Sequence, residues 1–337
     1  MFKRLISIIL TAILMFGVSG CGMSAVQKET VNDAVQEEKT VIRIGAMAGP
    51  TAMGMVKLRS DAESGNTDNE YEFQDFASDA SAFVTPLATG DIDIAAVPSN
   101  LAANIYNKTE GKVSVLAVNV LGVLNLVERG NSVNSIADLK GKTVYATGMG
   151  AVPEYTIRYI LNANNIDPDK DVSIVWCSDT TEALSKLKST DGAIAVLPQP
   201  FVTAASAQVK DLRVVMDLND AWGNTGADSK IVTGVIVVRK EFAEKYPQQL
   251  KKFMEEYQAS VRYISDDIDG ASELIADYGV VGSAAIAKKA LPDCHVVCLT
   301  GDDMKSALQG FLKVLYEQNP KSIGGSMPED DFYYEYE

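Results

Sequence analysis

The chain has 337 residues, of which 45 are Asp or Glu and 30 are Lys or Arg, so its net charge is -15. Such an acidic chain lacks the basic surface with which nucleic-acid-binding proteins neutralise phosphates, which excludes nucleic acid as a partner. One His and four scattered Cys cannot supply a Cys/His zinc cluster. The hydrophobic fraction of 47% is typical of globular proteins, and the length favours two domains of about 150 residues.

The first residues predict an exported protein with a lipid anchor. Two basic residues precede an apolar run, Leu5–Val18, and this pattern is typical of a signal peptide over residues 1–20. The run is shorter than the roughly 20 apolar residues that a permanent membrane helix needs. The next segment, Val18–Cys21, resembles the bacterial lipobox, in which the cysteine is diacylated and becomes the new N-terminus after cleavage. An ordinary signal peptide followed by an incidental Cys21 is the alternative.

Cleavage before Cys21 would change the net charge from -15 to -17, because Lys3 and Arg4 are removed. Residues 21–40 have little apolar content after the cysteine, so we expect a flexible tether. Outside the cytoplasm there is no pool of ATP or reduced nicotinamide. We therefore expect no cofactor, and no metal.

From Val41 onward, short β-branched runs alternate with amphipathic runs, as in an α/β fold with largely parallel sheets. The expected strands are 41–46, 71–77, 92–97, 113–120, 143–147, 172–176, 193–197, 212–216 and 234–238. The expected helices are 52–62, 80–88, 99–106, 152–164, 181–187, 241–264 with a new helix starting at Pro247, 271–278, 283–290 and 302–318, and a short helical turn is expected over 135–142. The longer apolar runs 113–127 and 232–238 should form core strands.

Ligands of open parallel α/β sheets bind beyond the carboxyl ends of the strands, where helix N-termini offer unpaired N–H groups. The loops Gly49–Met53 and Gly148–Gly150 suit this role, because glycine permits close backbone approach and Thr51 offers a hydroxyl. Tight strand–helix turns are the alternative use of these glycines. The expected ligand-binding residues are Gly49, Thr51, Ala52, Met53, Ser78, Ser99, Asn100, Gly148, Met149, Gly150 and Gln199.

Some of these side chains have equally plausible structural roles. Ser78 and Ser99 could cap the helices that follow them. Trp222 could form an aromatic lid over the ligand or pack in the core. Lys57 and Arg158 lie too far into their helices to identify a dedicated cation for a sulfonate or nitrate.

The segment Cys294–Cys298 contains two cysteines and the one histidine, His295. As a strand it would hold the two Cα atoms roughly 13 Å apart, beyond the ~7 Å that a disulfide permits. A tight turn would make a disulfide possible. With Cys177, three interpretations stay open: buried free thiols, a disulfide or a metal site.

Several motifs together resemble the extracytoplasmic solute-binding proteins of ABC importers, in the branch that handles nitrate, sulfonates, taurine and thiamine precursors. The motifs are Gly90–Ala95, Ser135–Val144, Gly148–Tyr155, Val196–Pro200 and Pro328–Tyr334. Relatives often have Glu where this chain has Gln199, so recognition of a cationic group is not expected from that position.

The resemblance implies a two-lobed periplasmic-binding-protein fold of type II, in which the chain crosses twice between two α/β lobes. The crossings should fall near 119–131 and 230–238. The implied division is residues 41–122 plus 236–320 for the first lobe, 123–235 for the second, and 321–337 for an acidic and aromatic C-terminal tail.

The resemblance also implies a function: a monomeric lipoprotein, outside the cytoplasm, that captures a small molecule and delivers it to an ABC permease and ATPase. The ligand would be a sulfonate, nitrate or taurine-like anion, or a heteroaromatic vitamin precursor, and no enzyme activity is expected. A sensory or ligand-presenting lipoprotein is the alternative. Pyrimidine-precursor enzymes of the same superfamily need several histidines and a cysteine-rich motif, which this chain lacks.

Overall fold

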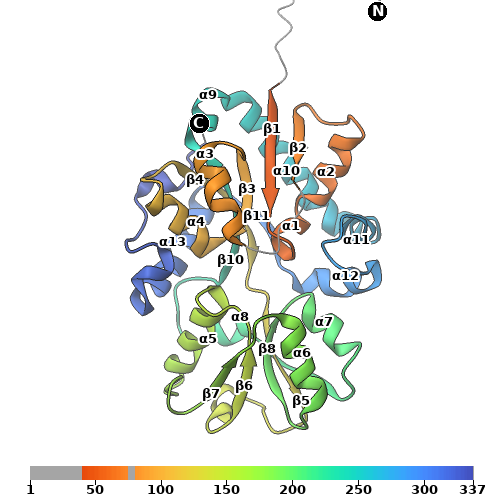
Figure 1. The fold of residues 1–337 in the computed structure, drawn as a ribbon, viewed down its shortest axis with the longest axis vertical. Coiled ribbons are helices and arrows are strands. Elements are labelled where there is room, and N and C mark those ends of the chain that lie inside the picture. Colours follow the sequence, from red (N-terminus) through yellow and green to blue (C-terminus); the bar gives the residue numbers. More distant parts are fainter. Residues whose placement is uncertain (1–39, 75–79, 337) are drawn as a thin grey trace, which may run out of the picture. The chain divides into compact units, whose positions relative to one another are not determined.

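The computed structural model describes residues 40–74 and 80–336 (Figure 1). The predicted signal peptide, the lipidation site Cys21 and the tether before residue 40 lie outside the described residues, as does Ser78. Within the described ranges, no helix has the length and apolar character needed to span a membrane. The rest of the chain forms two mixed sheets flanked by helices, which confirms the predicted α/β fold class.

The first sheet has the strand order β11-β4-β10-β3-β1-β2. Its strands are β1 (Val41–Ala46), β2 (Glu70–Phe73), β3 (Ile94–Pro98), β4 (Val113–Leu121), β10 (Val232–Arg239) and β11 (Val296–Leu299). β1 pairs in parallel with β2 and β3, whereas β10 runs antiparallel to both β3 and β4. The carboxyl ends of β1 and β3 therefore meet at one edge of this sheet.

The second sheet has the order β7-β6-β8-β5-β9. Its strands are β5 (Leu124–Arg129), β6 (Thr143–Ala146), β7 (Ser173–Trp176), β8 (Ile194–Pro198) and β9 (Leu212–Asp217). Here β6 is parallel to β7 and β8, and β5 is antiparallel to β8 and β9. The second sheet repeats the arrangement of the first, in which an antiparallel strand lies beside a parallel set.

The chain passes between the sheets twice, once from β4 to β5 and once from the end of β9 to β10. Only Gly122 and Val123 separate β4 from β5, so the apolar run 113–127 is divided between the two sheets. All of β10, from Val232, belongs to the first sheet. The division into lobes at 122/123 and 235/236 stays a prediction.

Helices cover both faces of the first sheet because side chains alternate along each strand. On β3, Ile94 and Ala96 pack in a cluster with α1, α2, α10 and α11, whereas Ala95 and Val97 face a cluster with α3, α4 and α13. The helices around this sheet are α1 (Pro50–Met53), α2 (Val56–Glu63), α3 (Val84–Thr89), α4 (Ser99–Lys108), α9 (Lys240–Lys245), α10 (Pro247–Asp266), α11 (Ile268–Asp277), α12 (Ala284–Ala290) and α13 (Gly301–Gln318).

The remaining helices follow strands of the second sheet. They are α5 (Val152–Ala163), α6 (Thr180–Ser189), α7 (Phe201–Ser206) and α8 (Leu218–Gly223). Short 3₁₀ turns cover Ala80–Phe83, Ile136–Leu139, Leu291–Asp293, Pro320–Ile323 and Asp330–Phe332. The short helical turn predicted over 135–142 is the 3₁₀ turn Ile136–Leu139.

The predicted helix 52–62 is interrupted by a side chain from α10. Ser260 Oγ donates to the carbonyl oxygen of Gly54 at 2.7 Å and accepts from the N–H of Leu58 at 3.0 Å. These two backbone groups would be hydrogen-bonded partners in a continuous helix, and an inserted hydroxyl separates them. The expected single helix is therefore two, α1 and α2.

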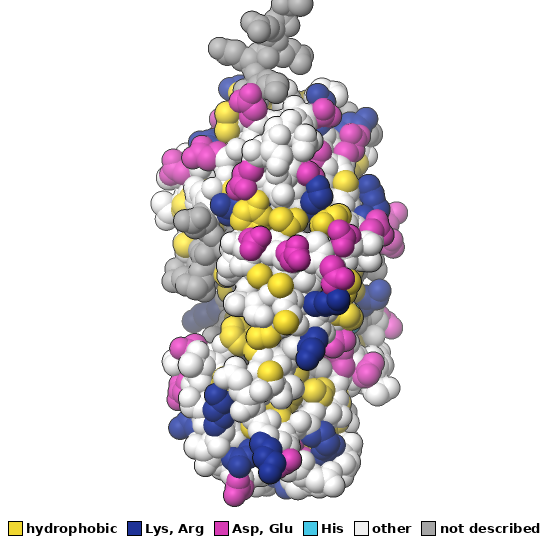
Figure 2. All heavy atoms as spheres, turned by 90° about the vertical axis from the view of Figure 1, so that its right-hand side faces the viewer, with side chains coloured by type: hydrophobic (Ala, Val, Ile, Leu, Met, Phe, Trp, Pro, Cys, Tyr) yellow, Lys and Arg dark blue, Asp and Glu magenta, His cyan; other side chains and the backbone are white. Residues whose placement is uncertain are grey.

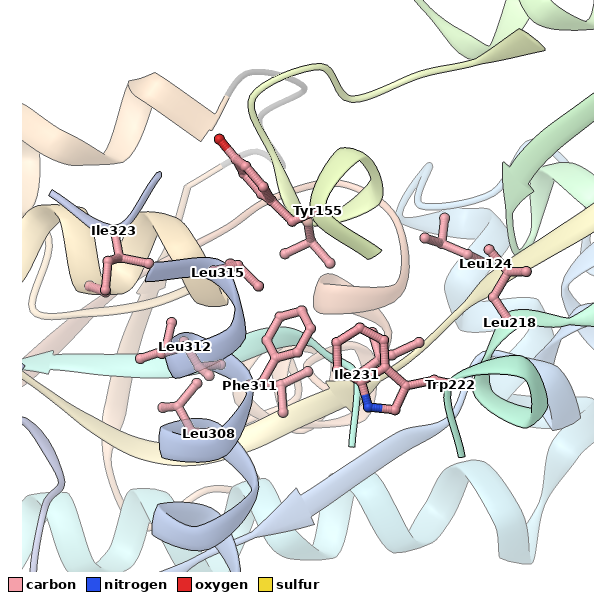
Figure 3. Packing of buried hydrophobic residues seen from close by; sticks show 14 of the residues in the cluster. Leu124, Tyr155, Leu218, Trp222, Ile231, Leu308, Phe311, Leu312, Leu315 and Ile323 are labelled. Carbon is pink, nitrogen blue, oxygen red and sulfur yellow. The ribbon is translucent and has the colours of Figure 1, made fainter. Parts of the chain in front are cut away.

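One buried apolar cluster extends across both sheets (Figure 3). Phe311 and Leu315 on α13 contribute from the first sheet's side, and Trp222 on α8 and Tyr155 on α5 contribute from the second. The rings of Trp222 and Phe311 are 5.6 Å apart. We call this contact between α13, α5 and α8 the α13 seam.

Candidate functional site

Four strand-to-helix loops lie at the carboxyl ends of parallel strands. In the first sheet, Ala46 of β1 is level with Ala96 of β3, so the loops that open α1 and α4 leave the same edge. In the second sheet, Ala146 of β6 is level with Val196 of β8, and the loops that open α5 and α7 leave together. These loops and the first residues of the helices that they open contain every predicted ligand-binding residue of the described part. Such edges are where α/β proteins bind ligands.

The α1 loop uses its hydroxyl internally. Thr51 is buried, and its Oγ1 donates to the carbonyl oxygen of Met47 at 2.6 Å. Asn119 Nδ2 donates to the carbonyl oxygen of Thr51 at 2.9 Å. Ala52 and Met53 pack in the core with fully buried side chains. The α1 loop can therefore contact a ligand through its backbone groups, beginning at Gly49. The φ of Gly49 is 102°, which favours glycine.

The side chains at the start of α4 likewise form hydrogen bonds within the protein. Ser99 Oγ donates to the carbonyl oxygen of Val232 at 2.6 Å, and Asn100 Nδ2 lies 3.4 Å from the carbonyl oxygen of Ser322. Neither side chain caps the helix. α4 starts after Pro98 without a side-chain cap, so its first N–H groups and its positive end face the loop edge.

The α5 loop combines backbone with one exposed apolar side chain. Gly148 and Gly150 have φ values of 81° and 76°, which only glycine adopts readily. Met149 between them is 70% exposed. The N–H of Gly150 donates to Glu154 Oε2 at 2.7 Å, and α5 itself starts without a side-chain cap.

At the α7 loop, Gln199 is buried and oriented by its neighbours. Its Oε1 accepts from the hydroxyl of Thr203 at 2.9 Å, and its Nε2 lies 3.5 Å from Asp293 Oδ2, which belongs to the first sheet's side. Phe201, two residues after Gln199, is 45% exposed. Sequence reasoning did not select Phe201, since an isolated aromatic residue after a proline carries no pattern that separates exposure from packing.

Two basic residues weighed as ligand partners are occupied elsewhere. Lys57 is paired with Asp61, one helical turn away. Arg158 forms ion pairs with Glu154 at 2.9 Å and Asp169 at 3.0 Å. The residues that form the four loops include no Lys or Arg. A bound anion would therefore depend on backbone N–H groups and helix dipoles.

Trp222 packs rather than covering a ligand. Its ring lies 4.4 Å from that of Tyr159, and its Nε1 donates to the carbonyl oxygen of Ser229 at 2.7 Å. It is almost fully buried in the α13 seam.

Over the face in Figure 2, basic and acidic side chains are interspersed along the molecule.

The three cysteines of the described residues are free thiols. Cys177, Cys294 and Cys298 are free, and Cys177 and Cys294 are buried. Burial raises the pKa of Cys294 to about 12 and that of Cys298 to about 11. Both therefore stay protonated at neutral pH, which makes them poor nucleophiles and poor metal ligands. Within the described ranges, no group of His, Cys, Asp and Glu could hold a metal ion.

Comparison with known proteins identifies the family. A family model described as "ABC transporter, phosphonate, periplasmic substrate-binding protein" matches residues 69–290. The chain belongs to this family. Members are binding proteins of transport systems rather than enzymes: they bind small molecules and deliver them to an ABC permease. The protein is accordingly an extracytoplasmic substrate-binding component of an ABC importer, and the resemblance found in the sequence is confirmed.

Solved structures show the same fold at low sequence identity. An ABC transporter structure from Parabacteroides distasonis is 23% identical, with a TM-score of 0.74 over 89% of this chain and 100% of that one. The periplasmic aliphatic sulphonate binding protein SsuA from Escherichia coli is 15% identical, with a TM-score of 0.70 over 88% and 92%.

The alkanesulfonate-binding protein SsuA from Xanthomonas axonopodis pv. citri, bound to MOPS, is 14% identical, with a TM-score of 0.61 over 86% and 94%. At these identities the likeness establishes the fold alone. None of the curated proteins matches the sequence.

Proposed function

We propose that this protein is the lipid-anchored, monomeric receptor of its importer and captures a small solute with an oxyanion group, of the sulfonate or phosphonate type. The observation that carries the proposal is the pair of uncapped helix starts. α4 and α5 begin without side-chain caps, at loops of the two different sheets. The N–H groups and dipoles at both starts favour an anion without any lysine or arginine, although Glu154 in the first turn of α5 already accepts the N–H of Gly150.

The exposed apolar side chains support a ligand that also has an apolar part. Met149 on the α5 loop and Phe201 on α7 are among the few large hydrophobic side chains exposed in the described residues. An alkyl chain on the sulfur or phosphorus would bury both side chains against it. The net charge of -17 after the proposed cleavage repels anions at long range, but beyond about 8 Å salt screens this repulsion, so local dipoles decide.

A thermal-shift screen followed by titration calorimetry tests the ligand. The panel contains alkanesulfonates, alkylphosphonates, taurine, nitrate, pyrimidines and riboflavin. An alkanesulfonate or alkylphosphonate should stabilise the protein, by about 2.7 kcal/mol at a hundredfold excess over its Kd. Stabilisation by a heteroaromatic compound alone, or by no member of the panel, would contradict the proposal.

A charge introduced at Met149 localises the site. Met149→Asp should weaken binding roughly tenfold, because a carboxylate then faces the bound anion across a partly screened distance. Val214→Asp, at a 47% exposed position of β9, is the matched control and should bind as the wild type does. Equal loss of affinity in both variants would mean that the effect is not local.

The lipid anchor is proposed from the sequence Val18–Cys21. Expression with an alkyne-tagged fatty acid should label the wild-type protein and retain it in the membrane fraction. Cys21→Ala should abolish both the label and the retention. Labelling that persists in Cys21→Ala would place the lipid elsewhere.

A further inference from the structure

The first crossing between the sheets is held by side chains from both sides. Gly122, directly after β4, has a carbonyl oxygen that accepts two hydrogen bonds. One comes from His295 Nδ1 at 2.5 Å and the other from Asn219 Nδ2 at 2.9 Å. His295 directly precedes β11 of the first sheet, and Asn219 lies on α8, which follows β9 of the second.

The contact with Asn219 is tightly fitted. A side chain at Gly122 would place its Cβ 1.9 Å from Asn219 Oδ1, so only glycine lets the amide approach the crossing. The second hydrogen of the Asn219 amide is donated to Asp217 Oδ1 at 2.8 Å, and Asp217 also accepts from the N–H of Asn219 at 2.7 Å. The donor on the second sheet's side is thereby fixed in position.

The donor on the first sheet's side is fixed as well. His295 has a φ of 44°, and its carbonyl oxygen accepts from the N–H of Leu121, the last residue of β4, at 3.2 Å. Its neighbour Cys294 is fully buried. Because a carbonyl oxygen can only accept, the Nδ1 of His295 carries the hydrogen in this contact.

The residues next to Gly122 make further hydrogen bonds between the two sides of the crossing. The carbonyl oxygen of Val123 accepts from the N–H of Gln199 at 2.8 Å, and the side chain of Gln199 reaches Asp293. Asp293 lies two residues before His295, in the segment that leads into β11. Both crossing residues are therefore tied to elements of the second sheet, and the segment before β11 contacts Gly122 directly and Val123 only through Gln199.

We propose that His295 is a positioning residue that, together with Asn219, sets the angle between the two sheets at Gly122. Hydrogen bonds weaken steeply when the donor angle departs from linearity. One oxygen can satisfy donors from two bodies only within a narrow range of relative orientations, so rotation about the crossing breaks one bond or the other. This proposal rests on the proposed function only because solute binding is what would move the lobes. The angle between the two sheets is set in the absence of a ligand as well.

The test measures the lobe angle in the ligand-free, full-length protein. Fluorophores are attached through non-natural amino acids at the exposed positions Asn162 on α5 and Glu255 on α10. These two helices flank different sheets. Single-molecule energy transfer then gives the distribution of distances. Removing the ring donor with His295→Ala should raise the population at other distances roughly fivefold, the effect of losing one hydrogen bond.

His295→Asn is the matched control. Asn tolerates a positive φ and carries an N–H donor at nearly the same position, so it should keep the wild-type distribution. Asn219→Ala is a second route, since it removes the other donor, and should broaden the distribution as His295→Ala does. Thermal melting of each variant separates loss of folding from loss of positioning.

Unchanged distance distributions in both His295→Ala and Asn219→Ala would overturn the proposal. So would equal broadening in His295→Ala and His295→Asn, because the donor would then be irrelevant. The measurement contains no solute, so a failed ligand panel leaves it unaffected. Conversely, a solute that binds the wild type while these distributions stay unchanged would retain the proposed function and reject His295 as a positioning residue.

Discussion

At Gly234, near the start of β10, the absence of a side chain decides how closely the α1 loop approaches the first sheet. A Cβ there would lie 2.5 Å from Thr51 Cγ2 and 2.6 Å from Asn119 Oδ1. Both neighbours are buried, and Asn119 is tied to Thr51 by a hydrogen bond. The position of a candidate ligand loop thus depends on a glycine more than 180 residues further along the chain.

Gly234→Ala should destabilise the protein by about 1–3 kcal/mol, the usual cost of an extra methyl group in a packed core. Gly223→Ala is the control, because nothing lies within 4 Å of its Cβ position at the end of α8. That variant should be neutral or up to about 1 kcal/mol more stable. Urea unfolding measures both, and equal midpoints for the two variants would contradict the packing argument.

Residue roles were the least predictable part of the site. The loops could be placed at shared sheet edges because parallel strands end together. Which partner each side chain would bond could not be predicted, because the partners are distant in the sequence. Ser99 donates to Val232, 133 residues away, across the pairing of β3 with β10. Such a bond leaves no trace in the local sequence around Ser99.

At the scale of elements, the C-terminal segment packs on the first sheet's side. Phe332 is fully buried in the apolar cluster, and Tyr333 pairs with Val115 of β4. The N–H of Tyr334 donates to the carbonyl oxygen of Val115 at 2.9 Å, and Ser114 Oγ donates to that of Asp331 at 2.8 Å. The segment therefore covers the part of β4 that β11 leaves unpaired.

Phe332→Ala should lower the free energy of unfolding by about 3–5 kcal/mol, since it leaves a cavity beneath the segment. The exposed Glu335, three residues later, provides the control, and Glu335→Ala should change stability by less than about 0.5 kcal/mol. Chemical denaturation followed by circular dichroism gives both values. An unchanged midpoint in Phe332→Ala would show that the segment contributes no packing energy.

Most strands and the longer helices could be predicted, whereas two short helices could not. β1 matches its predicted range, and the start of a new helix at Pro247 is confirmed. The six-residue helices α7 and α8 were missed, because so few residues establish no 3.6-residue period. The apolar run 113–127 indicated strand throughout, but hydrophobicity alone does not reveal that Gly122 divides it between two sheets.

For the whole molecule, the α13 seam couples the two sheets energetically. Phe311 and Trp222 belong to one buried cluster, and Gln318 Nε2 adds a hydrogen bond to the carbonyl oxygen of Tyr155 at 3.1 Å. Apolar burial of this kind stabilises both sides at once. We therefore expect the sheets to unfold together, although each has helices and core residues of its own.

Wild-type unfolding should be a single transition in which tryptophan fluorescence and far-ultraviolet circular dichroism coincide. Phe311→Ala should separate the two signals, because Trp222 loses its partner across the seam. Phe201→Ala removes an exposed ring instead and should leave the signals coincident. Two separate transitions in the wild type would mean that the seam does not couple the sheets.

The strand order also sets a sequence of events as the chain emerges during synthesis or export. The second sheet uses only residues 124–217, so it can be completed while the C-terminal third is still being made. The first sheet needs β1 from the beginning, β11 from near the end, and Tyr333 to cover β4. Strands β1, β2 and β3 can therefore pair with one another early, but β4 joins them only after β10 has appeared, and its other edge stays uncovered until almost the last residue.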